Sequence, residues 1–395
     1  MREHHLGTRL ARWAGALAAA SIALMAASCG GGGDTAGVGS GGTGIRLASV
    51  SYGSISGFGS VIVNGVRYDE TAATVTSDEG TTPGTLGLGM VVAVRGDIDS
   101  TGLGGKADAI TVFSEARGSV TAWSPTGFTL LGLAVRTTAN TYNEGAAAIA
   151  NGDYVEVYGI YDGSTGTLTA TRVELQAPAS RYKVRGAIGA FDGVARRFQL
   201  GALIVDFAGA SPVPNGLAAG TMVRVHANAE PFGGVLAATR VDLVEALDLG
   251  DVAKADIEGA VDRFVSLADF SVNGVRVDGS NAVLEGAAAS DLSVGRRLEV
   301  EGPVQAGLLR ASRIGFEDDA AGAFELRGLI ADFVDAGHFT VRGTPVDASG
   351  SVRYEGGGAA NLRNGACVEL EGTLQPTSTG SRVLATDIHF ESSCN

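Results

Sequence analysis

The sequence predicts an all-β protein built as a tandem array of five small five-stranded barrels. Three observations support this prediction. The pentapeptide Val-Asn-Gly-Val-Arg occurs twice, at 63–67 and 272–276, a strand that begins with glycine recurs five times, and each copy of that strand is followed by a second alternating strand. Similar turns and strands that return after about 70 residues indicate an internal repeat.

The strand that begins with glycine sets the register of the repeat. Its copies span 89–96, 152–159, 220–227, 295–302 and 365–372, so successive copies start 63, 68, 75 and 70 residues apart. Valine or leucine occupies alternate positions, and a period of two places these side chains on one face of a strand, the predicted core. The residues between them are expected to face outward: Glu156, Arg224, Glu299, Glu301, Glu369 and Glu371.

The other strands recur around this one. A further strand follows it at 106–113, 168–175, 236–243, 309–316 and 383–390. A hairpin precedes it at 58–68, 128–137, 198–207, 270–279 and 339–348. A short strand opens each unit at 117–123, 185–191, 258–264 and 327–333, and 52–57 is a shortened version in the first unit.

The repeated pentapeptide predicts the turn of the hairpin in the first and fourth units. Asn-Gly between alternating apolar residues is a strong hairpin signal, because both central positions of a type I′ turn need positive φ. After the hairpin the copies diverge, and the Ala-rich stretches 144–152 and 284–295 allow a short helical turn. Five short strands with such a connector suit a small barrel that resembles the oligosaccharide- and oligonucleotide-binding (OB) fold, and a sandwich-like meander is the alternative.

The N-terminus predicts export. A basic start, an apolar run at 13–27 and small residues before Cys29 form a signal peptide over 1–28, and the run is too short to span a bilayer. Cys29 follows Ala-Ala-Ser and resembles the lipidated cysteine of a bacterial lipobox, although Ala26 stands where that motif usually has leucine. The Gly-rich stretch 29–49 would then form a tether. Ordinary cleavage that releases a soluble protein is the alternative.

Linkers divide the remainder into five predicted domains. The domains are 50–114, 115–178, 181–247, 255–319 and 323–395. Units this small bury a modest fraction of their surface, so neighbouring units are expected to pack against one another.

Charge and cysteine content restrict the partners and the redox state. The formal net charge is −14, and such an acidic surface repels phosphate backbones, which argues against nucleic acid as a partner. Two cysteines remain after Cys29, at Cys367 and Cys394. An even number of cysteines in an exported chain predicts a disulfide between them.

Several of these features together resemble a known family. They are the leader, the stretch 56–69, the strand motif Gly-x-x-Val-x-Val-x-Gly and the trailing Ala-Thr-Arg-Val. The chain resembles bacterial envelope lipoproteins built from tandem copies of one domain of unknown function, family 5666 of that series, over nearly all of its mature length. The resemblance implies export, a small β-barrel repeat and an outer-membrane lipid anchor on the periplasmic face or the cell surface. It implies no catalytic residues.

The chain shows little sign of catalytic chemistry. It has no metal-ligand histidine spacing, no serine-nucleophile motif and no phosphate-binding loop, and His226 takes an outward strand position expected at the surface. Glu299 with Glu301, and Glu369 with Glu371, would stand about 7 Å apart on one strand face, which is within the range of inverting glycosidases. The pattern recurs at equivalent positions of two repeats, which favours a solvated strand face.

One stretch is a weak candidate for a metal site. Residues 96–108 place Asp97, Asp99 and Asp108 in a partial calcium-loop pattern. Asp108 stands where a bidentate glutamate is normally needed, and the stretch coincides with a hairpin turn of the repeat. No other metal and no cofactor is expected.

The sequence therefore predicts a non-catalytic envelope lipoprotein. It would be a structural array or a module that binds an envelope protein or a glycan through its barrel faces. A calcium- or glycan-binding module is the alternative, followed by an enzyme that uses one divergent loop between strands. A singular site would make one unit differ sharply from the others, and no unit does so in sequence.

Overall fold

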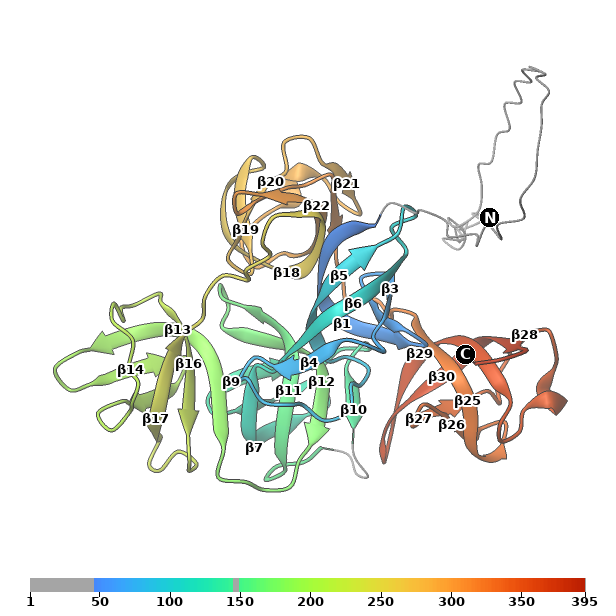
Figure 1. Cartoon of the computed structure of the whole chain (residues 1–395). Coiled ribbons are helices and arrows are strands. Elements are labelled where there is room, and N and C mark those ends of the chain that lie inside the picture. The colour runs from blue at the N-terminus through green and yellow to red at the C-terminus, as the bar shows by residue number, and fades with distance from the viewer. Residues whose placement is uncertain (1–45, 145–148, 395) are drawn as a thin grey trace, which may run out of the picture. The chain divides into compact units, whose positions relative to one another are not determined.

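A computed structural model describes residues 46–144 and 149–394 (Figure 1). This part of the chain consists of β-strands joined by short turns, with two 3-10 turns, η1 (Ala289–Asp291) and η2 (Ala359–Asn361). No helix in the described ranges is long and apolar enough to cross a membrane. The predicted signal peptide, Cys29 and most of the predicted tether lie outside these residues. The all-β prediction is confirmed.

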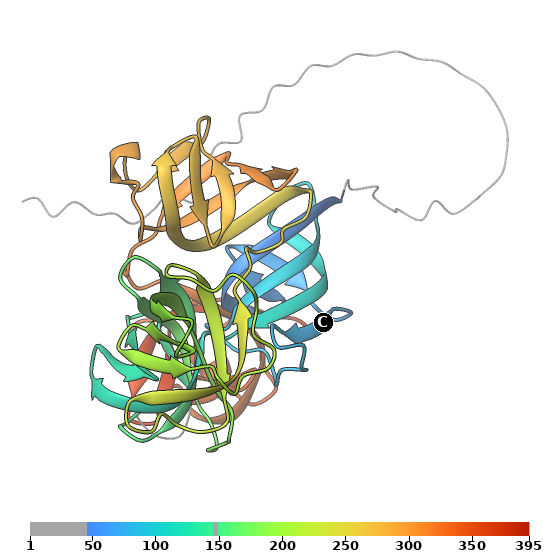
Figure 2. The ribbon, with the colours of Figure 1, turned by 90° about the vertical axis from the view of Figure 1, so that its left-hand side faces the viewer.

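The strands fall into five consecutive units, which Figures 1 and 2 colour from blue to red along the chain. Unit 1 contains β1 (Leu47–Phe58), β2 (Val61–Val63), β3 (Val66–Asp69), β4 (Thr74–Ser77), β5 (Val91–Ile98) and β6 (Gly104–Phe113). Unit 2 contains β7 (Ala116–Ser124), β8 (Gly127–Leu130), β9 (Leu133–Arg136), β10 (Tyr142–Glu144), β11 (Tyr154–Asp162) and β12 (Thr167–Leu175). Unit 3 contains β13 (Tyr182–Asp192), β14 (Arg197–Leu200), β15 (Leu203–Asp206), β16 (Met222–Ala227) and β17 (Val235–Leu243).

The last two units follow the same order. Unit 4 contains β18 (Val252–Ser266), β19 (Asp269–Val272), β20 (Val275–Asp278), β21 (Val283–Glu285), β22 (Arg297–Gln305), β23 (Leu308–Arg310) and β24 (Arg313–Phe316). Unit 5 contains β25 (Phe324–Asp335), β26 (His338–Val341), β27 (Thr344–Asp347), β28 (Arg353–Glu355), β29 (Cys367–Thr377) and β30 (Gly380–Glu391).

The strands of unit 1 form a closed circuit. β1 pairs antiparallel with β2 and β5, β2 with β3, and β5 with β6, whereas β3 and β4 pair with β6 in parallel. The equivalent strands close units 2 to 5 in the same way. Closure makes each unit a small barrel, not a sandwich-like meander, and it removes most of the free edges that an open sheet would leave.

The strands differ from the sequence expectation in several places. Four short strands, β4, β10, β21 and β28, lie where only a connector was expected, so the prediction of five strands in every unit is wrong. β1 has 12 residues and is not a shortened strand, and it begins at Leu47 within the predicted tether because Leu47–Ser54 pairs with β5. β18 begins at Val252, before the predicted domain start at 255. The strand predicted at 309–316 is divided into β23 and β24, which pair with separate parts of β22.

The predicted core residues are buried. The alternating pairs of the strand that begins with glycine are Val92 and Val94, Val155 and Val157, Val223 and Val225, Leu298 and Val300, and Val368 and Leu370, and each is at most 1% exposed. Full burial of one such side chain contributes about 1.5–3 kcal/mol. Strand alternation therefore determines which face of each strand points into its barrel.

The repeated Asn-Gly sequence forms the predicted hairpin turns. Asn64 and Gly65 have φ of 50° and 74°, and Asn273 and Gly274 have φ of 50° and 76°. The side-chain amide of Asn64 donates a hydrogen bond to the Tyr52 carbonyl oxygen at 3.2 Å. A Cβ atom on the neighbouring Gly53 would lie 2.1 Å from Asn64 Oδ1, so this strand position requires glycine.

Strand pairing also joins different units. β1 pairs in parallel with β18 of unit 4 over Ser49–Tyr52 and with β25 of unit 5 near Phe58. β7 of unit 2 pairs antiparallel with β13 of unit 3. The barrels are therefore joined by backbone hydrogen bonds as well as by linkers.

Candidate functional site

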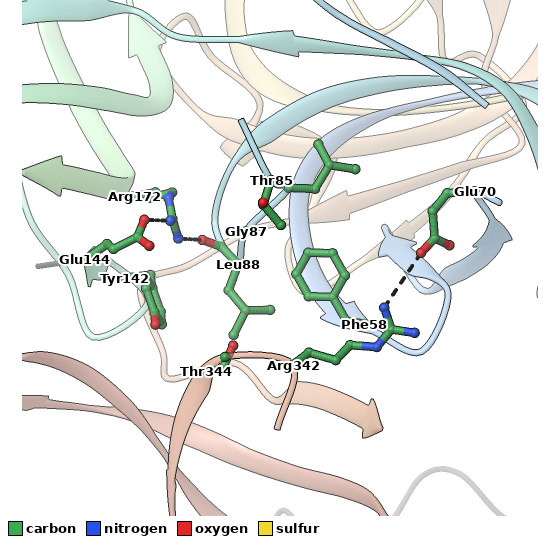
Figure 3. Close-up of a pocket in the computed structure, with 12 residues that line it drawn as sticks. Phe58, Glu70, Thr85, Gly87, Leu88, Tyr142, Glu144, Arg172, Arg342 and Thr344 are labelled. Carbon is green, nitrogen blue, oxygen red and sulfur yellow. Dashed lines mark hydrogen bonds and ion pairs between the residues drawn. The ribbon is translucent and has the colours of Figure 1, made fainter. Parts of the chain in front are cut away.

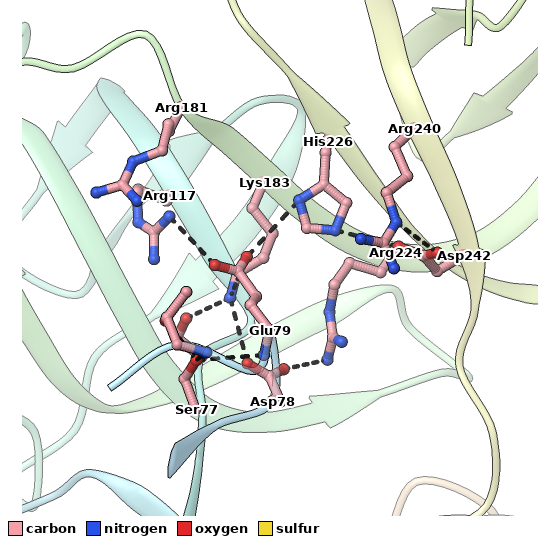
Figure 4. Close-up of polar contacts among 12 residues, drawn as sticks. Ser77, Asp78, Glu79, Arg117, Arg181, Lys183, Arg224, His226, Arg240 and Asp242 are labelled. Carbon is pink, nitrogen blue, oxygen red and sulfur yellow. Dashed lines mark hydrogen bonds and ion pairs between the residues drawn. The ribbon is translucent and has the colours of Figure 1, made fainter. Parts of the chain in front are cut away.

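The segment that connects β4 to β5 in unit 1 packs against units 2 and 3. We call residues 78–90 the connecting segment. Its acidic start, Asp78-Glu79, lies among basic side chains of β7, β13 and β16 (Figure 4). Its end contacts β12, where Thr171 Oγ1 donates a hydrogen bond to the Gly89 carbonyl oxygen at 2.6 Å.

Lys183 is the centre of the polar contacts. Its side chain is 1% exposed. Its Nζ atom lies 2.6 Å from Ser114 Oγ, 3.2 Å from a Glu79 carboxylate oxygen and 3.7 Å from an Asp78 carboxylate oxygen. A buried ammonium group needs such partners because its desolvation costs several kcal/mol.

Two more basic side chains complete this cluster. Arg224 Nη2 lies 2.5 Å from Asp78 Oδ2, and His226 lies 3.6 Å from Glu79 and 3.3 Å from Asp242. Burial raises the pKa of Asp78 against the opposing charges of Lys183 and Arg224. Burial alone would raise the pKa of Glu79, but Lys183 and Arg117 together hold that pKa below its usual value. We call Asp78, Glu79, Lys183, Arg224 and His226 the junction cluster.

Burial also lowers the pKa of His226, which favours the neutral imidazole, although Glu79 and Asp242 oppose this effect. The sequence prediction of a surface histidine is wrong, because the side chain of His226 is 21% exposed and lies between two carboxylates. Glu156 faces outward from its strand, as predicted, but other residues cover it. It is 9% exposed and accepts hydrogen bonds from Ser114 and Arg117.

A cavity of about 500 Å³, which we call the polar groove, adjoins the junction cluster. Its lining comes from units 1, 2 and 3 and includes Ser77, Thr81, Thr82, Arg117, Glu156 and Arg181. Figure 4 shows Arg117 and Arg181 beside the junction cluster. Arg181 is exposed and makes no ion pair with another residue that the structure describes. The groove is thus a charged, hydroxyl-rich surface between barrels.

A second cavity, of about 440 Å³, lies on the connecting segment as well (Figure 3). We call it the aromatic pocket. Phe58, Leu88 and Tyr142 line it together with Arg172 and Arg342. Units 1, 2 and 5 contribute these residues, and Thr85 and Glu144 line both this pocket and the polar groove.

Arg172 fixes the positions of several residues that line the aromatic pocket. Its side chain is 4% exposed and donates to the Leu88 carbonyl oxygen at 2.8 Å and to Glu174 at 2.5 Å. It also pairs with Glu144, and its guanidinium carbon lies 5.0 Å from the centre of the Tyr142 ring. One buried arginine thus connects β12, β10 and the connecting segment.

The predicted disulfide is present. Cys367 and Cys394 are joined with an S–S distance of 2.00 Å and a Cα–Cα distance of 5.6 Å. β30 ends at Glu391, so the chain leaves the strand before Cys394 and can reach Cys367 at the start of β29. Cys29, the predicted lipidation site, lies outside the described residues.

The calcium candidates are not gathered around one point. Asp97 lies within β5 and Asp108 within β6, whereas Asp99 accepts hydrogen bonds from the backbone of Thr101 and Gly102 in the turn between these strands. Within residues 46–144 and 149–394, no three His, Cys, Asp or Glu side chains form a group that could hold a metal ion.

Three of the four carboxylates in the strand-face pairs are engaged by arginine. Arg313 pairs with Glu299 and lies 3.4 Å from Glu301. Glu369 lies 3.3 Å from Arg67, which also pairs with Glu325. Glu371 is exposed and makes no ion pair with another described residue, as expected for a solvated face, whereas the other three acids are ion-paired.

The junction cluster was not predicted from the sequence. Lys183 is one of three lysines in the chain, and it stands directly between Tyr182 and Val184 in a strand. This rare charged residue in a strand was the sequence signal that could have indicated the cluster. Its acidic partners lie in a different unit, in the segment where the copies diverge.

Comparison with known proteins identifies the repeat. The family model described as "Domain of unknown function (DUF5666)" matches residues 53–104, 117–174, 258–315 and 327–389, which fall in units 1, 2, 4 and 5. No curated protein matches the chain. A solved structure described as "drosophila Unr CSD456" has 13% sequence identity and a TM-score of 0.14, and the match covers 48% of this chain and 89% of that one. The family model matches more than half of the chain, which therefore belongs to the DUF5666 family as a protein with tandem copies of this domain.

Proposed function

We propose that the protein is a non-catalytic lipoprotein of the cell envelope whose barrels form a fixed array that binds a partner or ligand. The observation that carries this proposal is the docking of the connecting segment on units 2 and 3 through the junction cluster. Flexibly linked barrels would not need a buried lysine between them. A fixed array can instead hold a binding surface that several units share.

The location belongs to the same proposal. Cys29 carries the lipid, the Gly-rich stretch after it is the tether, and the outer membrane is the destination. Stable anchoring needs more than one acyl chain, because each buried CH₂ contributes about 0.8 kcal/mol. The support is the sequence of the leader and the family resemblance.

The proposed absence of catalysis rests on the described carboxylates. The closest analogue of a glycosidase pair, Glu299 and Glu301, shares Arg313 as a counter-ion. Burial raises the pKa of Glu299 against the charge of Arg313. Because Arg313 contacts both carboxylates, it occupies the space between them that a substrate and its attacking water would need.

Two experiments test this proposal. Palmitate labelling and membrane fractionation should place the wild-type chain in the outer membrane and should release Cys29→Ala from it. Retention of Cys29→Ala in the membrane fraction would refute the anchor.

The array itself is tested through a partner captured from envelope extract with the full chain. Lys183→Met loosens the junction cluster and should weaken binding of that partner by about tenfold or more, as expected for a loss of at least about 1.4 kcal/mol. Lys106→Met, at an exposed lysine, is the control. Equal binding by both variants would show that the fixed arrangement is irrelevant to function.

A further inference from the structure

We propose that the polar groove and the aromatic pocket together bind a short, uncharged oligosaccharide. This inference rests on the proposed function, because it names the class of ligand that the array would hold. The two cavities share Thr85 and Glu144, so they adjoin across the connecting segment. Their volumes, about 500 Å³ and about 440 Å³, both fall within the range of small-ligand sites.

The charges in the polar groove are balanced. Its lining contains five carboxylates: Asp78, Glu79, Glu144, Glu156 and Glu174. Five cations oppose them, because Arg117, Arg181 and Lys183 line the groove and Arg172 and Arg224 pair with its acids. A ligand with a large net charge would therefore gain little from the groove, whereas an uncharged one would not disturb these pairs.

The groove presents hydrogen-bonding groups that are already held in place. Glu156 Oε1 accepts hydrogen bonds from Ser114 and Arg117, while Oε2 accepts none from the residues that the structure describes. Glu174 is held by Arg172 at 2.5 Å and by Gln176 at 2.9 Å. Groups that are ordered before binding lose little conformational entropy when a ligand arrives.

Hydroxyl groups line the part of the groove that unit 1 contributes. Ser77, Thr81, Thr82 and Thr85 belong to the end of β4 and the connecting segment. The Oγ atoms of Ser77 and Thr81 lie 2.7 Å apart, and Thr82 and Thr85 are exposed. Carboxylates that accept and hydroxyls that both donate and accept match a ligand with many hydroxyl groups.

The aromatic pocket supplies the complementary surface. The side chains of Phe58, Leu88 and Tyr142 line it and are at most 7% exposed. A sugar ring has an apolar face of C–H groups and a polar edge of hydroxyls. Such a ring can place its edge against Arg342, which is 43% exposed, and its face against the accessible parts of Phe58 and Tyr142.

Two other ligand classes fit less well. Nucleic acid is disfavoured by the net charge of −14. A peptide bound by strand addition needs a free sheet edge. The strand β11, which contributes Glu156 and Tyr158 to the groove, has none, because it pairs with both β12 and β7. The peptide library tests the edges of β4 and β10, which each pair with one described strand.

The test is calorimetric titration of the full chain in detergent. The probes are short oligomers of glucose, of N-acetylglucosamine and of xylose, with galacturonic acid oligomers and a peptide library as comparators. The main variant is Gly84→Trp. A Cβ on Gly84 meets nothing within 4 Å, its φ lies outside the positive range, and this glycine lines the polar groove, so a large side chain here meets no clash at Cβ and reduces the space of the groove. Gly350→Trp is the matched control, because it is equally open and lies elsewhere.

We expect at least one neutral oligomer to bind the wild type and Gly350→Trp, with affinity lower by about tenfold or more in Gly84→Trp. Thr85→Ala and Arg181→Ala change exposed residues and should each weaken binding, whereas Arg363→Ala, an exposed arginine outside both cavities, should not.

Two results would overturn this inference. The first is no binding of any neutral oligomer, or equal binding by Gly84→Trp and the wild type. The second is capture of the acidic oligomers or a peptide in the same cavity, which would reject the ligand class but leave the proposed binding array standing. Capture of an envelope partner by the wild-type chain is measured separately from oligomer binding, so failure of the array and failure of the ligand class are distinguishable.

Discussion

The side-chain amide nitrogen of Asn64 lies 3.1 Å from both the carbonyl oxygen and a carboxylate oxygen of Asp256. The hairpin turn of unit 1 is thereby bonded to the first strand of unit 4, next to the parallel pairing of β1 and β18. Asp256 is 2% exposed. Burial raises its pKa well above 3.8, and the nearby carboxylates of Glu299 and Glu301 add to this effect.

The first prediction concerns the charge of Asp256. The folded-state pKa of Asp256 lies above the unfolded value of 3.8. The protonated carboxyl therefore contributes stability that is fully present below pH 3.8 and is lost as the pH rises through the folded-state pKa. Asp256→Asn keeps an oxygen for Asn64 and removes the buried charge. We expect it to stabilise the protein at neutral pH by roughly 1 kcal/mol or more, measured by urea unfolding from pH 4 to 8. Asp108→Asn, at an exposed position, should change little. A loss of stability in Asp256→Asn at neutral pH would show that the charged form is favoured by Lys254 and Arg313.

The second prediction concerns Lys183. Lys183→Met removes the ammonium group that lies 3.2 Å from Glu79 and 3.7 Å from Asp78. The two carboxylates then lose a buried partner, and we expect a loss of about 3–5 kcal/mol in the free energy of unfolding. Urea titration at neutral pH measures it, with Lys106→Met as the exposed control.

Neutralising the partners should reverse most of that loss. The triple variant with Asp78→Asn and Glu79→Gln no longer contains the unpaired acids, so it should be more stable than Lys183→Met alone. If it is less stable, the effect of Lys183 arises from packing of its aliphatic stem and not from charge.

The third prediction concerns pH. Burial, together with the neighbouring Glu369, raises the pKa of Glu325 to about 7, although Arg67 opposes the shift. Because the folded-state value lies above 4.5, the protonated form stabilises the fold, and that contribution falls as the pH rises from 4.5 through about 7. We expect Glu325→Gln to flatten the pH dependence of stability in this window, with Glu355→Gln as an exposed control. An unchanged slope in thermal unfolding between these pH values would contradict this assignment.

The fourth prediction concerns the disulfide. Cys367 and Cys394 are 27 residues apart, and closure of a loop of that length stabilises a fold by about 3–4 kcal/mol in the chain-entropy model. Reduction, or the double replacement with serine, should lower the unfolding temperature of unit 5. Mass measurement without reductant should find no free thiol at these positions. Two free thiols in the purified mature protein would contradict the pairing.

The sequence was sufficient for most of the local structure. Alternation of valine and leucine located the strands and their inward faces, because strand periodicity depends only on neighbouring residues. Asn64-Gly65 and Asn273-Gly274 predicted two hairpin turns, because few other residues accept positive φ at both turn positions. The disulfide followed from the two cysteines available to form it.

The tertiary structure decided what covers the outer faces of the barrels. Strand alternation places Glu156 and Arg224 outside their own barrels. It does not show whether another unit lies over them. Lys183 and its partners Asp78 and Glu79 belong to different units, and their residues have no periodic pattern in common. The junction cluster, the polar groove and the aromatic pocket are therefore properties of the packing between units. That packing depends on contacts between residues far apart in the chain, which local periodicity does not encode.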